Sequence, residues 1–395
     1  DVAAEKLGIS PAAIRLQNLL RAGYANGIGQ VMHDSNGNVV RCTEIIADKL
    51  FAKPKPDLGP HIAVGRGMAS YMKTPCMPTN TPSGAFIKLN SDGTVSMCTG
   101  AVDMGQGLHT ALAQIGAEAL GLPFEKVHFQ YSVDTLTSPY DWQTVASHST
   151  WGAGNATILA AEDLKRKLRE EGAKVFGVPA EEVSAEAGEV RYQDRAIGWS
   201  EFATGIRNPD GSARTKPVMG EGYFVPKGIQ NHDPKTGQGN AAADWTLGCV
   251  GAEVAVDQRT GEVTVLRLIN AIDAGTIINP TLAKEQVSGA MLMAAGSVLS
   301  ETVVFDEKTG RVRNNTLVDY KIPGIEDIPC ETEVIFVQTP EESGPYGAKG
   351  IGEHGAVGTA PALLNAIYDA TGLRFHTLPA SADRITVLRK GGGVR

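Results

Sequence analysis

The sequence predicts an α+β fold of two related halves, with mixed sheets and flanking helices. Two similar β-hairpins carry this prediction, 84–97 with a turn at 91–93 and 251–265 with a turn at 259–261. In each hairpin, apolar and polar residues alternate on both sides of a turn that contains glycine. Each return strand leads to an Asp-containing turn and then to a helix-like segment. The alternative is two unrelated hairpins, because such turns are common.

The N-terminal segment 1–22 predicts a helix with a break at 8–11. Ser10 is suited to cap the helix that resumes there, and Pro11 to take its first position. A turn is expected at 36–38, and the proline-rich stretch 53–59 reads as a connector. The chain starts inside an apolar helical pattern with no N-cap before it, so we expect it to be part of something longer, through a split gene or processing.

Two glycine-containing loops precede the clearest helices of the first half. Gly105-Gln106-Gly107 is expected to form the first turn of a helix that ends at 121–123. Residues 146–156 combine hydroxyls and glycines before a second long helix. A helix N-terminus offers unpaired N–H groups and a positive dipole end, which suits an anion or a polar ring edge. The alternative for each loop is a structural turn or a well-capped helix.

The segment 344–355 is the most informative part of the chain. Four glycines between 344 and 352 lead to a single carboxylate, Glu353. A strand-like stretch at 333–337 precedes it and a helix-like stretch at 361–368 follows it, which places Glu353 on a strand-to-helix connection. Such loops often carry functional groups, although most glycine-rich loops are only tight turns.

Bulk properties exclude several classes of protein. The 395 residues allow about two to three domains. The net charge of −8, with both signs spread along the chain, argues against a nucleic-acid or anionic-membrane surface. No apolar run reaches the length of a membrane span. The five cysteines, which are Cys42, Cys76, Cys98, Cys249 and Cys330, form no Cys-x-x-Cys pair, so free thiols in a cytoplasmic protein are expected.

Four segments together resemble the xanthine dehydrogenase/aldehyde oxidase family of molybdenum hydroxylases. Residues 101–107 are similar to that family's Gly-Gln-Gly pterin loop, and 144–156 to its serine-rich cofactor loop. Residues 273–289 resemble a third landmark, and 344–353 resemble the Gly-Ala-Lys-Gly-x-Gly-Glu signature of its catalytic glutamate. The order and spacing agree from about residue 1 to 385.

The resemblance implies a division of the chain and a set of site residues. Residues 1–60 would end the family's first molybdopterin-binding domain, and 61–395 would form the second, with halves at about 61–245 and 246–395. Glu353 would be the catalytic base, near the metal without ligating it, because the pterin dithiolene holds the molybdenum. The implied cofactor-binding residues are Gly105, Gln106, Gly107, Ser147, His148, Ser149, Thr150, Asn155, Gln286, Lys349, Gly350, Ile351 and Gly352. His148 departs from the family pattern, since many relatives have arginine there.

The resemblance also implies cofactors and partners. The cofactor would be molybdenum-molybdopterin, in its cytosine dinucleotide form, with 2Fe-2S clusters and FAD on partner subunits. A separate polypeptide would supply the N-terminal half of the molybdenum subunit. The expected reaction is hydroxylation of an electron-poor carbon in an N-heterocycle, such as nicotinate or a purine, with oxygen from water. Three alternatives stay open: an aldehyde oxidoreductase, a non-catalytic structural subunit, and a ligand-binding module without metal.

Overall fold

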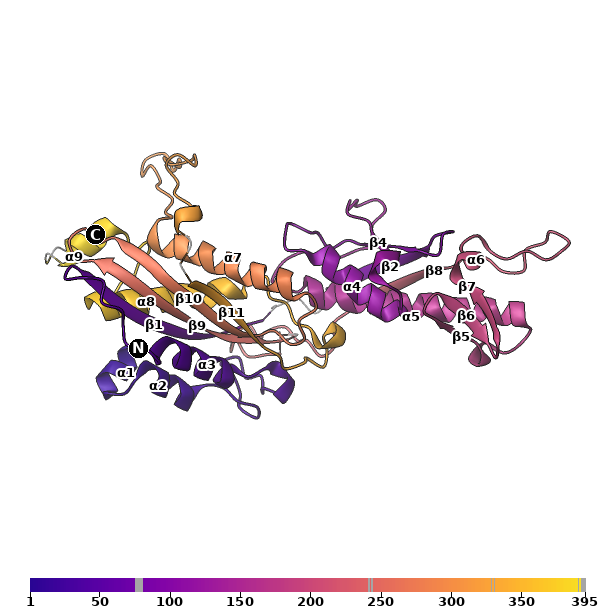
Figure 1. Ribbon diagram of the computed structural model, residues 1–395, viewed down its shortest axis with the longest axis horizontal. Helices are drawn as coiled ribbons and strands as arrows, with labels where there is room; N and C mark the ends of the chain where they lie inside the picture. The colour runs from indigo at the N-terminus through magenta and orange to yellow at the C-terminus, as the bar shows by residue number, and fades with distance from the viewer. Residues whose placement is uncertain are drawn as a thin grey trace. The chain divides into compact units, whose positions relative to one another are not determined.

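The computed structural model describes residues 1–74, 81–240, 242, 244–327, 329, 331–389 and 391. These residues form two compact units (Figure 1). Unit 1 comprises Asp1–Lys73, Trp245–Thr339 and Ile351–Arg395, and unit 2 comprises Thr74–Asp244 and Pro340–Gly350. The chain therefore passes between the units four times. Cys42, Cys98 and Cys249 are free thiols, as expected, whereas Cys76 and Cys330 lie outside the described residues.

Unit 1 is built on a four-stranded sheet in the order β1-β9-β10-β11. The antiparallel strands are β1 (Ile62–Lys73), β9 (Thr246–Asp257) and β10 (Val263–Asp273). The last strand, β11 (Glu331–Val337), runs parallel to β10. Every residue of β9 except Asp257 is buried, so this strand reads as a continuous core strand between layers that cover both faces.

Helices cover both faces of this sheet (Figure 1). On one face, α8 (His354–Thr371) packs against β1 and β9, while α7 (Pro280–Leu299) packs on α8 and against β10 and β11. The core there includes Met291, Val250 and Leu363. On the other face, α3 (Val39–Phe51) packs through Cys42, Ile46 and Leu50. The shorter helices of the unit are α1 (Val2–Leu7), α2 (Pro11–Asn18), η1 (Asp34–Asn36), η4 (Ile325–Asp327) and α9 (Ala382–Arg389). Ser10 caps α2 as predicted, because its Oγ accepts the N–H of Ala13 at 3.0 Å.

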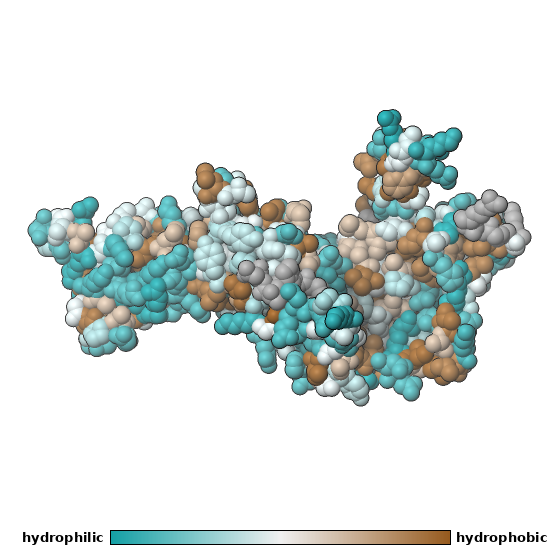
Figure 2. Space-filling view, turned by 180° about the vertical axis from the view of Figure 1, so that it is seen from behind, coloured by the Kyte–Doolittle hydropathy of each residue, from teal (hydrophilic) through white to brown (hydrophobic). Residues whose placement is uncertain are grey.

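An arm of irregular chain, residues 300–324, follows α7. Within it, Phe305 and Val312 form an isolated antiparallel β-bridge, and Tyr320 Oη donates to Glu301 Oε2 at 2.7 Å. Several of its apolar side chains are exposed, and Figure 2 shows apolar and polar residues intermixed on the face it displays.

Unit 2 contains a second four-stranded sheet in the order β4-β3-β2-β8. Its strands are β2 (Ser83–Leu89), β3 (Val95–Thr99), β4 (Val127–Phe129) and β8 (Met219–Phe224). The helices α4 (Leu108–Leu120) and α5 (Ser149–Phe176) pack on each other, and α5 also packs on β8 and β2. A small antiparallel sheet of β5 (Ser184–Glu186), β6 (Glu189–Tyr192) and β7 (Arg195–Gly198) adjoins α5. The remaining elements are η2 (Phe124–Lys126), η3 (Ala180–Glu182), α6 (Trp199–Thr204) and η5 (Pro345–Gly347).

The two units repeat one plan, which agrees with the predicted α+β fold class. Each unit contains an antiparallel hairpin, β2-β3 or β9-β10. Its second strand, β3 or β10, pairs with a parallel strand, β4 or β11. Its first strand, β2 or β9, pairs with an antiparallel strand, β8 or β1. The helix after each hairpin is α4 or α7, and the next long helix is α5 or α8.

The repeat extends to how each outer strand meets its helix. A Cβ added at Gly67 of β1 would lie 2.3 Å from the Ala362 carbonyl oxygen of α8. A Cβ added at Gly222 of β8 would likewise lie 2.3 Å from the Ala156 carbonyl oxygen of α5. Real Cβ atoms do not approach an oxygen so closely, so each strand touches its helix backbone only because glycine has no side chain.

Three helix starts differ from the sequence prediction. The helix after Glu353 begins at His354 and contains Pro361, instead of beginning near Pro361. The helix after Gly105-Gln106-Gly107 begins at Leu108, so those residues lie before it. The helix of the second loop begins at Ser149, within the predicted loop. In the part of the chain that the structure describes, no helix has the length and apolar character that a membrane crossing needs.

Candidate functional site

In unit 1, Glu353 occupies the N-cap position of α8. It therefore lies between β11 and α8, as the sequence predicted, and its side chain is 57 % exposed. The backbone before it is fixed from α7, because Gln286 Nε2 donates to the Gly352 carbonyl oxygen at 2.6 Å. The backbone after it is also packed tightly, since a Cβ on Gly355 would lie 2.4 Å from the Val287 carbonyl oxygen. The result is an exposed carboxylate on a braced backbone.

The carboxylate of Glu353 is paired with Lys73, the last residue of β1. Lys73 Nζ lies 2.6 Å from Glu353 Oε2. Next in the chain, His354 is 1 % exposed. Burial, followed by the Lys73 ammonium, lowers the pKa of His354 to about 3, although the Lys73 and Ile351 backbone and the Glu353 carboxylate act to raise it. His354 is therefore neutral around pH 7, and it adds no positive charge beside Glu353.

The turn after β10 is organised by Asp273, which is fully buried. Its carboxylate accepts the N–H of Asn38 at 2.8 Å, the N–H of Thr339 at 3.0 Å and the Thr339 hydroxyl at 2.6 Å. These bonds join two separate stretches of unit 1 to the segment that leads to α7 and Gln286. Ile351, the remaining predicted residue of this unit, packs against the cluster of Ile272, Ala274 and Val287.

In unit 2, the loop 102–107 is closed on itself by Asp103. The Asp103 carboxylate accepts the N–H groups of Gly105 at 2.9 Å, Gly107 at 3.2 Å and His109 at 3.1 Å. Although burial acts to raise it, these bonds hold the pKa of Asp103 below its usual value. The Gln106 side chain also bonds locally, since its Oε1 accepts from Met104 N and its Nε2 donates to Val102 O. In this structure, the N–H groups of Gly105 and Gly107 therefore donate to a carboxylate of their own loop.

The second loop enters α5 through two residues with left-handed backbone, Ala146 at φ 57° and Ser147 at φ 65°. His148, at the N-cap position, makes no side-chain capping bond to the helix. Its ring is 2 % exposed and its Nε2 is bonded to the Gln143 carbonyl oxygen. Nearby, burial raises the pKa of Asp141 above its usual value. Ser149 and Thr150 form the first turn of α5, whose N–H groups are not capped by the His148 side chain.

Residues 340–350 lie against the start of α5. Trp151 Nε1 donates to Ser343 Oγ at 3.1 Å, and Asn155 Nδ2 donates to the Ser343 carbonyl oxygen at 2.8 Å. The backbone of Gly350 lies in close contact with the backbone of Ser147, since a Cβ on Gly350 would lie 1.6 Å from the Ser147 carbonyl oxygen. Lys349 is only 3 % exposed, so it does not point into open solvent.

The first loop joins this group as well, because Val102 N donates to Thr144 Oγ1 at 2.7 Å. Unit 2 thus brings together the loops 102–107 and 144–150 and the glycine-rich stretch 343–350. Unit 1 brings together Gln286, Ile351, Gly352 and Glu353. Among the described residues, no group of three or more His, Cys, Asp or Glu side chains is arranged to hold a metal ion.

Sequence reasoning missed three residues that organise these loops. Asp103 was noticed only as a turn residue, although an Asp before a Gly-x-Gly helix start is a recognisable signal for a carboxylate that binds backbone N–H groups. Ser343 and Lys73 had no local signal. Lys73 is 280 positions away from Glu353 in the chain.

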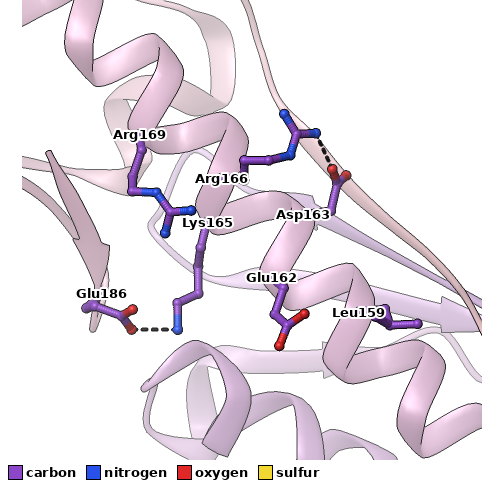
Figure 3. A pocket seen from close by; sticks show the side chains of 7 residues that line it. All are labelled: Leu159, Glu162, Asp163, Lys165, Arg166, Arg169 and Glu186. Atoms are coloured by element: carbon purple, nitrogen blue, oxygen red, sulfur yellow. Dashed lines mark hydrogen bonds and ion pairs between the residues drawn. The ribbon is translucent and has the colours of Figure 1, made fainter. Parts of the chain in front are cut away.

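The detected hollow on the surface, about 560 Å³, is elsewhere on unit 2 (Figure 3). It is lined by Leu159, Glu162, Asp163, Lys165, Arg166, Arg169 and Glu186. Most of its charges are paired with each other, as in the Lys165–Glu186 contact at 2.6 Å and the Arg166–Asp163 pair. It begins at Leu159 on α5, about 15 Å along the helix from the loop that starts it. We therefore do not assign the hollow to the candidate site.

Comparison with known proteins gives one family. The profile of the molybdopterin cofactor-binding domain matches residues 51–329. The probable hypoxanthine oxidase XdhD of Escherichia coli (strain K12) is 34 % identical over 343 residues, which are 86 % of this chain and 34 % of that protein. The putative xanthine dehydrogenase molybdenum-binding subunit XdhA of the same organism is 32 % identical over 392 residues, 98 % of this chain and 50 % of that protein.

A solved structure gives the same result. The aldehyde oxidoreductase of Desulfovibrio gigas matches with a TM-score of 0.80 and 26 % identity, covering 99 % of this chain and 40 % of that one. The chain thus spans between about a third and a half of the length of these relatives.

Proposed function

Because this chain belongs to the xanthine dehydrogenase/aldehyde oxidase family, we propose that it is the C-terminal part of a molybdopterin-binding subunit and contributes the general base to a molybdenum hydroxylase. The observation that carries this proposal is the position of Glu353. It is an exposed carboxylate at the end of a Gly-Ala-Lys-Gly-x-Gly-Glu stretch, and Gln286 and Lys73 brace it. A carboxylate held this way accepts a proton without first reorganising its backbone.

The loops of unit 2 fit a pterin with phosphates. The His148 side chain does not cap the first turn of α5, so the dipole and N–H groups of that turn suit a phosphate. Around Gly105, an added Cβ would meet no atom within 4 Å, which leaves space for a ring edge. We assign phosphate binding to 147–151 instead of 105–107, because Asp103 already accepts from Gly105 and Gly107.

When bound, molybdenum-molybdopterin would supply the redox chemistry and an oxygen derived from water. The contribution of this chain would be a positioned base, the Glu353 carboxylate, that accepts a proton during the reaction. The cytosine dinucleotide form of the cofactor belongs to this proposal. So do a chain carrying the N-terminal half of the subunit, a 2Fe-2S subunit, an FAD subunit and a cytoplasmic location.

We propose an N-heterocycle as substrate, since XdhD and XdhA are named for purines and are 34 % and 32 % identical to this chain. The second candidate is an aldehyde, because the aldehyde oxidoreductase of Desulfovibrio gigas has the same fold. Steady-state assays of the purified complex with hypoxanthine, nicotinate and benzaldehyde separate the two. Turnover of the aldehyde alone would overturn the first choice.

The test of the base is Glu353→Gln in the purified complex. The substitution keeps the shape and the Lys73 contact but removes the proton acceptor. We expect an unchanged molybdenum content and a kcat lower by about 10³-fold or more, since general-base catalysis contributes about 10²–10⁴. Glu342→Gln, at an exposed glutamate of the same segment, is the control and should turn over normally. Near-normal kcat in Glu353→Gln would refute the assignment.

A further inference from the structure

A lysine lies beside the proposed base. Lys73 Nζ is 2.6 Å from Glu353 Oε2, within the range of a charge-assisted hydrogen bond. The two residues belong to the same compact unit. Lys73 is the more enclosed partner, with 18 % of its side chain exposed against 57 % for Glu353.

Backbone packing fixes the position of Lys73. It pairs with the buried Thr246 of β9 at the end of a continuous ladder from Ile62 to Lys73. Upstream in β1, Gly65 and Gly67 touch the α8 backbone, where an added Cβ would lie 2.0 Å and 2.3 Å from carbonyl oxygens. Since β1 and α8 are in such close contact, the end of the strand is held at the start of the helix.

Several described residues beside this pair carry no charge. His354, on α8, is neutral. Gln286 on α7 and Thr246 on β9 are uncharged, as are Ile351 and Gly352 in the connection before Glu353. Lys73 supplies the ammonium that lies within hydrogen-bond distance of the carboxylate, and a partly buried ammonium is costly to leave without a counter-charge.

We propose that Lys73 is a positioning residue for the reaction of Glu353: its ammonium holds the carboxylate in one orientation and keeps it ionised. This inference rests on the proposed role of Glu353 as the base. An adjacent opposite charge favours the ionised form of a carboxylate. Lys73 therefore extends the pH range in which the base is ready to accept a proton toward lower pH.

The test compares Lys73→Met, which removes the charge, with Lys73→Arg, which keeps it, in the full complex. In Lys73→Met we expect the acid limb of the kcat/KM profile to move up by about one pH unit, the low end of the effect of an adjacent charge because Glu353 is half exposed. Lys73→Arg should restore most of the wild-type profile. Lys88→Met, at an exposed lysine of β2, is the control and should leave the profile unchanged.

A second readout does not depend on turnover. The infrared band of the protonated Glu353 carboxyl group can be assigned as the difference between wild type and Glu353→Gln. In a pH titration this band should appear at higher pH in Lys73→Met, by a shift similar to that of the kinetic profile. A purely structural lysine would lower the melting temperature without moving either titration. If Lys73→Met does not assemble, Lys73→Gln provides the same comparison.

The outcomes separate this inference from the proposed function. An inactive Glu353→Gln together with wild-type titrations in Lys73→Met would overturn the role of Lys73 alone. An active Glu353→Gln would overturn the base assignment. In that case the infrared titration still reports whether Lys73 keeps Glu353 ionised.

Discussion

His354 should make the stability of unit 1 depend on pH. Its imidazole is 1 % exposed and its pKa is lowered from 6.5 to about 3, first by burial and then by the Lys73 ammonium. The unfolded chain therefore binds a proton at this residue from about pH 6.5 downward, while the folded protein does not. It follows that the stability contributed by neutral His354 is complete above pH 6.5 and is lost as the pH falls toward 3.

The magnitude follows from the width of this window. Each pH unit below the unfolded pKa costs about 1.4 kcal/mol while the folded protein remains unprotonated. Between pH 7 and pH 5 the free energy of unfolding should fall by about 2 kcal/mol through this residue alone. His354→Leu, which cannot ionise, should abolish that part of the pH dependence.

Hydrogen exchange measures this locally, because peptides from α8 report the opening of unit 1. Exchange in urea gives the free energy of unfolding of wild type and of His354→Leu at pH 7 and at pH 5. The difference between the two proteins should change by about 2 kcal/mol from one pH to the other. His128→Leu, at an exposed histidine of β4, is the control for the loss of a histidine in general. A difference that stays constant across this pH range would show that His354 is not held neutral by its surroundings.

Two further substitutions test the packing and the loop. Gly67→Ala should destabilise unit 1 by about 1–3 kcal/mol in urea unfolding, because the added methyl group collides with the α8 backbone. The control is Gly289→Ala in α7, where an added Cβ meets no atom within 4 Å. It should be neutral or stabilising. Equal losses in both would contradict the close approach of β1 and α8. Asp103→Ala should cost about 1–2 kcal/mol and speed amide exchange at Gly105, Gly107 and His109, because these three N–H groups lose their acceptor. Unchanged exchange at these residues would argue against this role of Asp103.

The hairpins and the helices after them could be predicted from the sequence because their signals are local. Alternation around Asp92-Gly93 and around Thr260-Gly261 is readable within a dozen residues. The strands β1 and β8 could not be predicted the same way. They carry Gly-x-Gly pairs, at 65–67 and 220–222, which weaken any strand signal and are explained only by a helix distant in the chain.

The start of α8 shows how packing overrides local preference. Residues 354–360 contain two glycines and precede Pro361, so they read as a loop, and proline favours the first helical position. The structure extends the helix to His354, where Gly355 packs against α7. That contact requires a glycine, and the sequence alone does not reveal it.

The candidate site was partly predictable. The glycine-rich segments and Glu353 stood out by composition, and the structure brings the stretches 144–150 and 343–350 together. The state of the loop amides was not predictable. Whether the N–H groups of Gly105 and Gly107 face a ligand or Asp103 depends on one side-chain orientation, which sequence patterns do not encode.

The separation of β1 from β9 has a consequence for how the chain folds during synthesis. β1 leaves the ribosome first, yet its pairing partner follows only after residues 74–244 have been made. Those residues are most of unit 2 and can collapse on their own, since domains tend to fold as they emerge. Until β9 has been synthesised, both edges of β1 remain unpaired. Unpaired strand edges promote intermolecular aggregation. Slow translation or growth at high temperature should therefore expose this protein to aggregation through β1, and expression together with a holdase chaperone should improve its yield.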